Sequence, residues 1–462
     1  MKVHPLAGLV RRSRFTLLVM TLALVLGTPV AASASDWTPA TPDAKAATSS
    51  LATTGFLAVP VNFAGGFSTP AAEGAFQPRF LGDFVRSANP WFAAVSEGAY
   101  AGEPTSALEP VSIQPREQLC TQPWRDELHT LSDAAIRARG FEPNDYKAVV
   151  YYFPLTDPAR CNYTGFTHGN RVIINGGSGF QTLIHELGHT LGLGHAGSRY
   201  CTTANGVRVT LSDFIGGSCT EHEYGDVYSA MGVGLDAMTY GSAQLEQLGW
   251  NAGKVERLGT TTPTVTKFLT TLENDVAGST EALRVDDSGA VLWLEYRTPT
   301  GVDTPFFSTG PLGGLLVRLE TTSHDNRAPF LLDMTPEDDD HLWTPGRNIH
   351  PEMRVGQTWV NPRGNLSFTL NSTSPFGASV TITQLTRPVP DLRGLRSATA
   401  RTTITTAGFV VGSTTGVTDA LCESVGKVIS QTPVQGTRLL PGRVVDFTFG
   451  VAPVRGCPGT QQ

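Results

Sequence analysis

The sequence lacks several features that mark membrane proteins, nucleic-acid-binding proteins and zinc fingers. Charged residues make up only 16% of its 462 residues, and the formal net charge is −7. Its six cysteines include no C-x-x-C pair, which argues against a zinc site built from cysteines. Beyond the N-terminal segment, no stretch approaches the length of apolar sequence that a transmembrane helix needs. We therefore expect a globular protein without a membrane span.

The N-terminus is predicted to be a signal peptide, residues 1–34. Three arginines within residues 11–14 precede an apolar run over residues 15–26, and Ala32-Ser33-Ala34 fits a cleavage site. Cleavage would remove four basic residues and no acidic one, which moves the net charge from −7 to −11. That charge argues against nucleic acid or anionic membranes as partners. We expect a secreted protein, or one associated with the cell wall, with a flexible lead-in over residues 35–52.

Residues 185–195, His-Glu-Leu-Gly-His-Thr-Leu-Gly-Leu-Gly-His, concentrate the chemistry of the chain. His185 and His189 lie one helical turn apart, so both imidazoles can reach one zinc ion at about 2.0–2.1 Å. Gly192 lets the chain turn out of the helix, so that His195 supplies a third ligand. Three neutral nitrogens leave the fourth tetrahedral position open for water, which is typical of a catalytic zinc site.

The helix that carries this motif is predicted to begin with a capping box formed by Ser178 and Gln181. Its apolar residues follow helical spacing and form the buried stripe: Phe180, Leu183, Ile184, Leu187 and Leu191. His185, Glu186 and His189 lie off that stripe and are expected to face a cleft. An amphipathic helix with stray histidines is the alternative, and the added glycine and third histidine argue against it.

The signature HExxHxxGxxH is that of the metzincin metallopeptidases, and this chain resembles their gametolysin-like branch. The stretch 224–232, Tyr-Gly-Asp-Val-Tyr-Ser-Ala-Met-Gly, resembles the methionine turn of that branch, and Gln247-Leu248-Gly249-Trp250 is also similar. We favour Met231 as the turn methionine. Met238 is the rival, because Met238-Thr239-Tyr240 matches the form seen in astacin-like relatives. Either methionine could instead be a core filler.

The resemblance covers residues 53–386 and implies a zinc endopeptidase that acts on proteins or peptides. One Zn²⁺ would be bound by the three histidines, and Glu186 would take a proton from the zinc-bound water and pass it to the leaving amine. Met231 would form the floor of the site. Tyr228 or Tyr240 is a candidate hydrogen-bond donor to the transition state, with simple packing as the alternative.

The expected fold is an α+β metzincin-type domain over residues 53–252, a mixed twisted sheet with the zinc helix. Strands are predicted at 55–63, 146–153 and 171–175, and helices at 78–95 and 123–139. In such folds the strand before the zinc helix is a free edge, so residues 170–175 are the candidate substrate-binding edge. An ordinary edge strand is an equal alternative.

Residues 253–386 are predicted to form an all-β domain, with strands at 290–297 and 314–319. Three segments resemble the region that follows the zinc domain in gametolysin-like sequences: 292–297, 331–336 and 355–359. Four consecutive acids at 337–340 offer carboxylates to Ca²⁺, although a solvated acidic turn is favoured.

Residues 387–451 resemble a small α+β PASTA-like module and leave 452–462 as a tail. PASTA modules are linked with bacterial cell-wall fragments, so peptidoglycan is a candidate partner and a spacer is an equal alternative. The module departs from the pattern by its added cysteines. All six cysteines lie in the exported part, where disulfides form. They allow fifteen pairings, and the simplest, sequential one joins Cys120–Cys161, Cys201–Cys219 and Cys422–Cys457.

Three functions remain open. The favoured one is a secreted zinc endopeptidase. The second is hydrolysis of peptide cross-links in the cell wall, and the third is a non-enzymatic wall-binding protein on an inactive protease scaffold. The presence of Glu186 and of all three histidines argues against the third.

Overall fold

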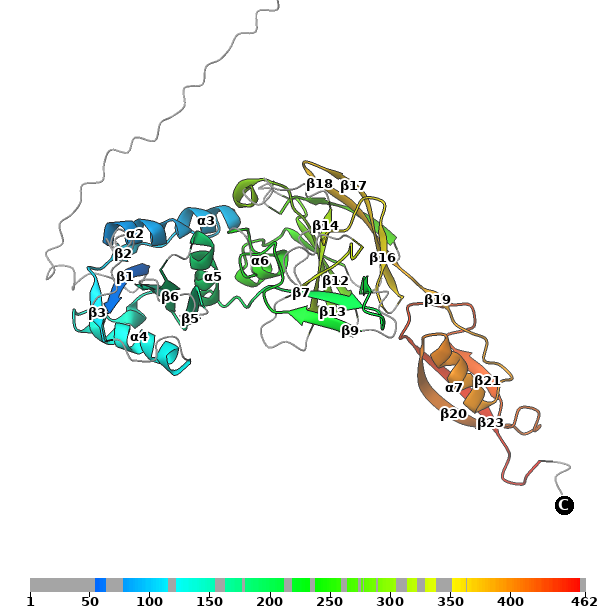
Figure 1. Ribbon diagram of the computed structural model, residues 1–462. Coiled ribbons are helices and arrows are strands. Elements are labelled where there is room, and N and C mark those ends of the chain that lie inside the picture. Colours follow the sequence, from blue (N-terminus) through cyan, green and yellow to red (C-terminus); the bar gives the residue numbers. More distant parts are fainter. Residues whose placement is uncertain are drawn as a thin grey trace, which may run out of the picture. The chain divides into compact units, whose positions relative to one another are not determined.

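The computed structural model describes residues 55–63, 78–114, 122–153, 163–176, 179–211, 218–232, 237–258, 264–272, 276, 278–287, 290–304, 314–321, 329–337, 351–362 and 364–457 (Figure 1). Several predictions therefore fall on residues that are not described: the signal peptide and lead-in, the Cys120–Cys161 pair, and acids 338–340 of the candidate calcium segment. Among the described helices, none is long and apolar enough to cross a membrane.

The first sheet has a parallel centre built from three apolar strands, β1 (Phe56–Phe63), β4 (Ala148–Phe153) and β6 (Arg171–Asn175). Both faces of β1 and β4 are buried, which explains their continuous apolar sequence. The order among described strands is β2-β1-β4-β6-β5, and β3 also pairs with β1. The remaining strands are β2 (Thr105–Ala107), β3 (Val111–Ile113) and β5 (Gly165–His168).

Helices cover both faces of this sheet (Figure 1). One face packs against α2 (Pro78–Arg86), α3 (Ala88–Val95) and α5 (Phe180–Thr190), and the other against α4 (Gln122–Arg137). The stretch 78–95, predicted to be mostly helical, forms the two helices α2 and α3, which meet at Ser87. A short 3₁₀ helix, Pro143–Asp145, precedes β4.

The strand predicted as the free, substrate-binding edge is internal. β6 pairs in parallel with β4 on one side and antiparallel with β5 on the other. The prediction that residues 170–175 form the edge is therefore wrong, and β5 takes the edge position among the described strands. Strand β5 was not predicted, because it has only four residues, which are too few for a clear periodic pattern, and joins β6 through the two-residue turn 169–170.

A second sheet contains eight described strands, and its first strand in the chain begins directly after the HExxHxxGxxH motif. β7 (Gly197–Thr202) pairs in parallel with β15 (Phe330–Leu332) and antiparallel with β9 (Ser218–His222). The predicted boundary between residues 252 and 253 thus does not separate the two sheets. The other strands are β8 (Arg208–Val209), β10 (Val255–Leu258), β12 (Ala282–Asp287), β13 (Ala290–Tyr296) and β14 (Leu315–Thr321).

A four-stranded antiparallel sheet packs on the second sheet and encloses an apolar core. Its order is β11-β18-β17-β16, with β11 (Thr264–Thr270), β16 (Thr358–Val360), β17 (Leu366–Ser374) and β18 (Gly377–Gln384). Helix α6 (Ser242–Leu248) and a 3₁₀ turn at Gly301–Asp303 also lie in this part of the sequence, but their apolar residues Leu245 and Val302 pack into the core that α3 and α5 share.

The C-terminal module has its own core and a three-stranded sheet in the order β20-β23-β21. Helix α7 (Ser397–Thr406) packs on this sheet. The sheet is formed by β20 (Val410–Thr418), β21 (Val428–Thr432) and β23 (Val444–Val451), and β19 (Arg387–Pro388) pairs with β22 (Arg438–Leu439) in a separate two-stranded sheet. Two disulfides are formed as sequential pairing predicts, Cys201–Cys219 between β7 and β9 and Cys422–Cys457 in the C-terminal module.

Candidate metal centre

Helix α5 begins differently from the prediction. Its N-cap is Gly179, which has no side chain to cap the helix, and Ser178 lies outside the described residues. Gln181 does not reach back to the helix start, because its amide donates to the carbonyl oxygen of Ala230 at 3.0 Å. This bond fixes the first turn of α5 to the segment that contains Met231.

The three histidines of the motif come together. Their candidate ligand nitrogens all lie within 4.8 Å of one another. Gly192 has a φ of +88°, a conformation that glycine adopts easily and that turns the chain back after α5. Burial lowers the pKa of His185 to about 4 and also lowers the pKa of His189, which keeps both imidazoles neutral at pH 7 and able to bind a metal.

Each imidazole is oriented through its Nδ1 atom. His185 Nδ1 lies 2.9 Å from the carbonyl oxygen of Ala230, and His189 Nδ1 lies 2.8 Å from that of Leu193. His195 Nδ1 lies 2.6 Å from Oε1 of Glu223. These contacts leave the three Nε2 atoms to act as ligands, the arrangement expected around a zinc ion. The motif gave no sign of Glu223, although a ligand histidine commonly has such a carboxylate partner.

Glu186 lies beside the histidines with only 5% of its surface exposed. Its Oε2 accepts a hydrogen bond of 2.8 Å from the hydroxyl of Thr167 on the edge strand β5. Burial raises the pKa of Glu186 to about 7, and the bond from Thr167 acts in the opposite direction. A Cβ at Gly165 would lie 3.0 Å from Oε1, so β5 packs closely against this carboxylate. The edge strand β5 is therefore in direct contact with Glu186, the candidate base.

Met231 is fully buried and lies against Gly188, between the two helical histidines in sequence. A Cβ at Gly188 would overlap Met231 Sδ, so the helix leaves room for the methionine there. Met238 packs elsewhere, in a buried cluster that includes Val227 and Leu316. The structure therefore places Met231, and not Met238, beneath α5.

Tyr228 and Tyr240 are both fully buried, and the Tyr240 hydroxyl donates to the carbonyl oxygen of Ile184 at 3.2 Å. The structure thus favours the packing alternative for both and gives neither a route to a substrate. Tyr224 is placed differently. It is 39% exposed, and its ring centroid lies 4.0 Å from that of His195 and 6.0 Å from that of His185. Tyr224 belongs to the stretch that resembles a methionine turn, and no role was predicted for it.

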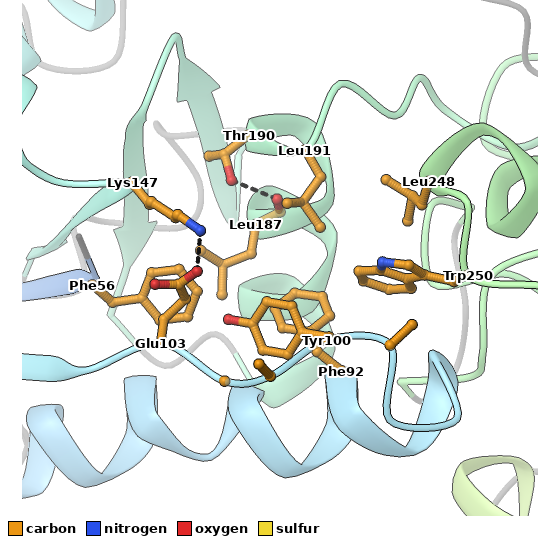
Figure 2. A pocket seen from close by; sticks show the side chains of 13 residues that line it. Phe56, Phe92, Tyr100, Glu103, Lys147, Leu187, Thr190, Leu191, Leu248 and Trp250 are labelled. Atoms are coloured by element: carbon orange, nitrogen blue, oxygen red, sulfur yellow. Dashed lines mark hydrogen bonds and ion pairs between the residues drawn. The ribbon is translucent and has the colours of Figure 1, made fainter. Parts of the chain in front are cut away.

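A cavity of about 460 Å³ lies on another face of α5 (Figure 2). Leu187 and Thr190 of the helix and its C-cap residue Leu191 line the cavity, together with Tyr100 and Trp250. The Glu103–Lys147 ion pair lies at its side. Neither the three histidines nor Glu186 lines this cavity. The cavity is therefore separate from the candidate metal centre.

Comparison with known proteins identifies one part of the chain. Residues 388–451 match the family model of the PASTA domain. This part of the chain is a PASTA domain. The prediction of a PASTA module at 387–451 is thereby confirmed, and the domain suggests ligands related to peptidoglycan. Together with the disulfides, it is compatible with an extracellular or cell-wall location. No curated protein and no solved structure matches the chain.

Proposed function

We propose that this chain is a secreted zinc-dependent endopeptidase of the gametolysin-like metzincin type. The observation that carries the proposal is the histidine triad with every Nδ1 engaged, next to the buried carboxylate of Glu186. Three imidazoles with free Nε2 atoms suit Zn²⁺ in a site that keeps one position open. A structural zinc site would be closed by a fourth protein ligand, and no fourth residue joins this group among the described residues.

When bound, zinc supplies a Lewis acid at the scissile carbonyl and lowers the pKa of water to about 7. Glu186 then performs the proton transfers. Thr167 holds Oε2 of Glu186, which leaves Oε1 to accept a proton from the attacking water and to return it to the leaving amine. A carboxylate whose pKa is raised by burial can carry out both steps near neutral pH.

The edge strand β5 provides a surface for the substrate. An extended peptide would add to this edge through main-chain hydrogen bonds and would then lie beside Glu186, because Thr167 belongs to the same strand. Tyr224 lies next to His195 and is partly exposed. Its hydroxyl is our candidate donor to the oxygen that becomes negative in the transition state.

Hydrolysis of casein by residues 35–462 tests the proposal. Glu186→Ala should lower kcat by at least about 10²–10⁴-fold, and a chelator should abolish activity that zinc restores. Glu142→Ala is the matched control, because this exposed carboxylate pairs with Arg137 and makes no contact with the histidines. Full activity of the Glu186 variant, or after metal removal, would exclude the proposal.

The PASTA domain favours a second candidate, hydrolysis of peptide cross-links in the cell wall. The comparison is between casein and purified peptidoglycan as substrates for the same preparation. Release of peptides from peptidoglycan alone would support the wall hydrolase. Stoichiometric zinc binding with hydrolysis of neither substrate would instead support the inactive, wall-binding scaffold.

A further inference from the structure

Five charged side chains form a buried network in the β-rich part, and none is more than 1% exposed: Asp226, Glu295, Arg297, Asp303 and Arg318. Arg318 Nε donates to Asp226 Oδ2 at 2.6 Å, and Arg297 Nε donates to Asp303 Oδ2 at the same distance. Glu295 forms ion pairs with both arginines. Buried charges are costly unless they are paired in this way, so the network must be held in one arrangement.

The network forms hydrogen bonds to the turn that contains Met231, residues 226–231. Asp226 opens this turn, and its Oδ1 accepts the N–H of Tyr228 at 2.8 Å. Arg297 Nη1 donates to the carbonyl oxygen of Tyr228, also at 2.8 Å. One arginine therefore fixes the turn through the side chain of Asp226, and the other fixes it through the main chain of Tyr228.

Residues 226–231 also bond to His185 directly and to Ala196, the neighbour of His195, so the turn is connected to two of the three candidate zinc ligands. The carbonyl oxygen of Ala230 forms a hydrogen bond with Nδ1 of His185. Ala196, which directly follows His195, donates its N–H to the carbonyl oxygen of Met231 at 2.8 Å and accepts the N–H of Asp226 at 3.1 Å. Arg318 is therefore linked to His195 by one hydrogen bond to Asp226, a second from Asp226 to Ala196, and the peptide bond between Ala196 and His195.

We propose that Arg297 and Arg318 are positioning residues of the metal centre, which act through the turn 226–231 on His185 and His195. The inference rests on the proposed zinc site. A guanidinium binds a carboxylate or carbonyl with fixed direction, so the two arginines set the place of the turn and hence of the imidazoles. The β-rich part is then a component of the catalytic unit and not an appended domain.

Zinc affinity of purified residues 35–462, measured by competition with a chromophoric chelator, tests the inference. Asp226→Asn keeps an oxygen for the Tyr228 N–H but loses the charge that Arg318 binds. We expect it to weaken zinc binding about 10–100-fold, as loss of an outer partner commonly does. Arg318→Lys, which keeps the charge but loses the planar fork, should weaken binding in the same direction.

Asp133→Asn is the matched control. Asp133 is equally a buried carboxylate, paired with Arg171 at 2.8 Å, but it lies on α4 and makes no contact with the turn. Its zinc affinity should stay within about twofold of the wild type. Wild-type affinity in Asp226→Asn and Arg318→Lys would overturn the inference and leave the proposed function intact. Absence of zinc binding by the wild type would overturn both.

Thermal unfolding separates positioning from support of the whole fold. Both variants should unfold cooperatively and remain folded at the temperature of the zinc measurement. If both are unfolded there, the inference is overturned, because the network would then support the whole chain and not the turn in particular.

Discussion

The histidine centre and the buried arginine network contact the same turn, residues 226–231, but they are built in different ways. All three histidines lie within one eleven-residue stretch, whereas Arg318 lies 92 residues away from its partner Asp226. The histidines are candidate metal ligands that a local motif can encode. The network exists only after distant strands have packed together. The comparison shows that a short motif can specify the ligands while tertiary structure specifies their support.

The largest effect should come from breaking the network. Arg297→Met leaves the buried carboxylates of Asp303 and Glu295 without this partner, and we expect it to lower the free energy of unfolding by about 3–5 kcal/mol. Urea unfolding followed by tryptophan fluorescence measures the change. Arg137→Met, which removes an exposed arginine paired with Glu142, should cost less than about 1 kcal/mol. Equal losses in the two variants would contradict the role given to the network.

The network should also respond to acid. Burial alone would raise the pKa of Glu295, but the charges of Arg318 and Arg297 outweigh it and lower the pKa from 4.5 to about 2. Because the folded pKa is depressed, this pairing stabilises the fold above pH 4.5 and is lost as the pH falls toward 2. The stability difference between wild type and Glu295→Gln, on the order of 3 kcal/mol at neutral pH, should shrink across this window. A difference that stays constant from pH 5 to pH 2 would refute the prediction.

A smaller effect, on zinc affinity, is expected when a hydrogen-bond partner of the histidine centre is changed. Glu223→Gln weakens the acceptor for His195 Nδ1, and zinc affinity should fall about 10-fold, at the low end of such effects because this carboxylate is exposed. The neighbouring Glu221→Gln, whose carboxylate lies 3.6 Å from Arg199, is the control and should bind zinc like the wild type. Chelator competition at pH 7 measures both variants, and an unchanged affinity for Glu223→Gln would remove its orienting role.

The smallest effect should follow removal of residues 387–462. The hydrogen bonds that orient the histidines and the turn join residues between 181 and 318, so zinc affinity should stay within about twofold. Binding to purified peptidoglycan, measured by sedimentation, should be lost if the PASTA domain provides it. Retained sedimentation of the shortened chain would assign wall binding to another part.

The sequence predicts the helices and strands that have strong local patterns. It does not predict the strands whose formation or place in a sheet depends on pairing with another strand. Continuous apolar runs predicted β1 and β4, and helical spacing predicted α5. The edge strand β5 was missed, because four residues carry too little periodicity and only its pairing with β6 makes it a strand. Likewise the place of β7 in the second sheet depends on β15, far along the chain, so no local signal could set that boundary.

The candidate site shows the same division. The candidate ligands and Glu186 follow from the spacing of the motif, and the three histidines do converge. Tyr224 and Glu223 could not be assigned, because their distance from His195 depends on the path of the chain between β9 and the Met231 turn. Tyr228 and Tyr240 looked equally suitable as donors in sequence, and only their burial separates them from Tyr224.

The parallel pairing of β7 with β15 determines when, during synthesis of the chain, the candidate site can be completed. A chain made from its N-terminus completes the histidine motif long before Arg318 and β15 have been synthesised. Until those residues arrive, β7 has no parallel partner and the turn under α5 has no arginine to hold it. On the proposed function, hydrolytic competence would therefore require synthesis through residue 332 at least, and a chain interrupted before Arg318 would lack the support of the turn.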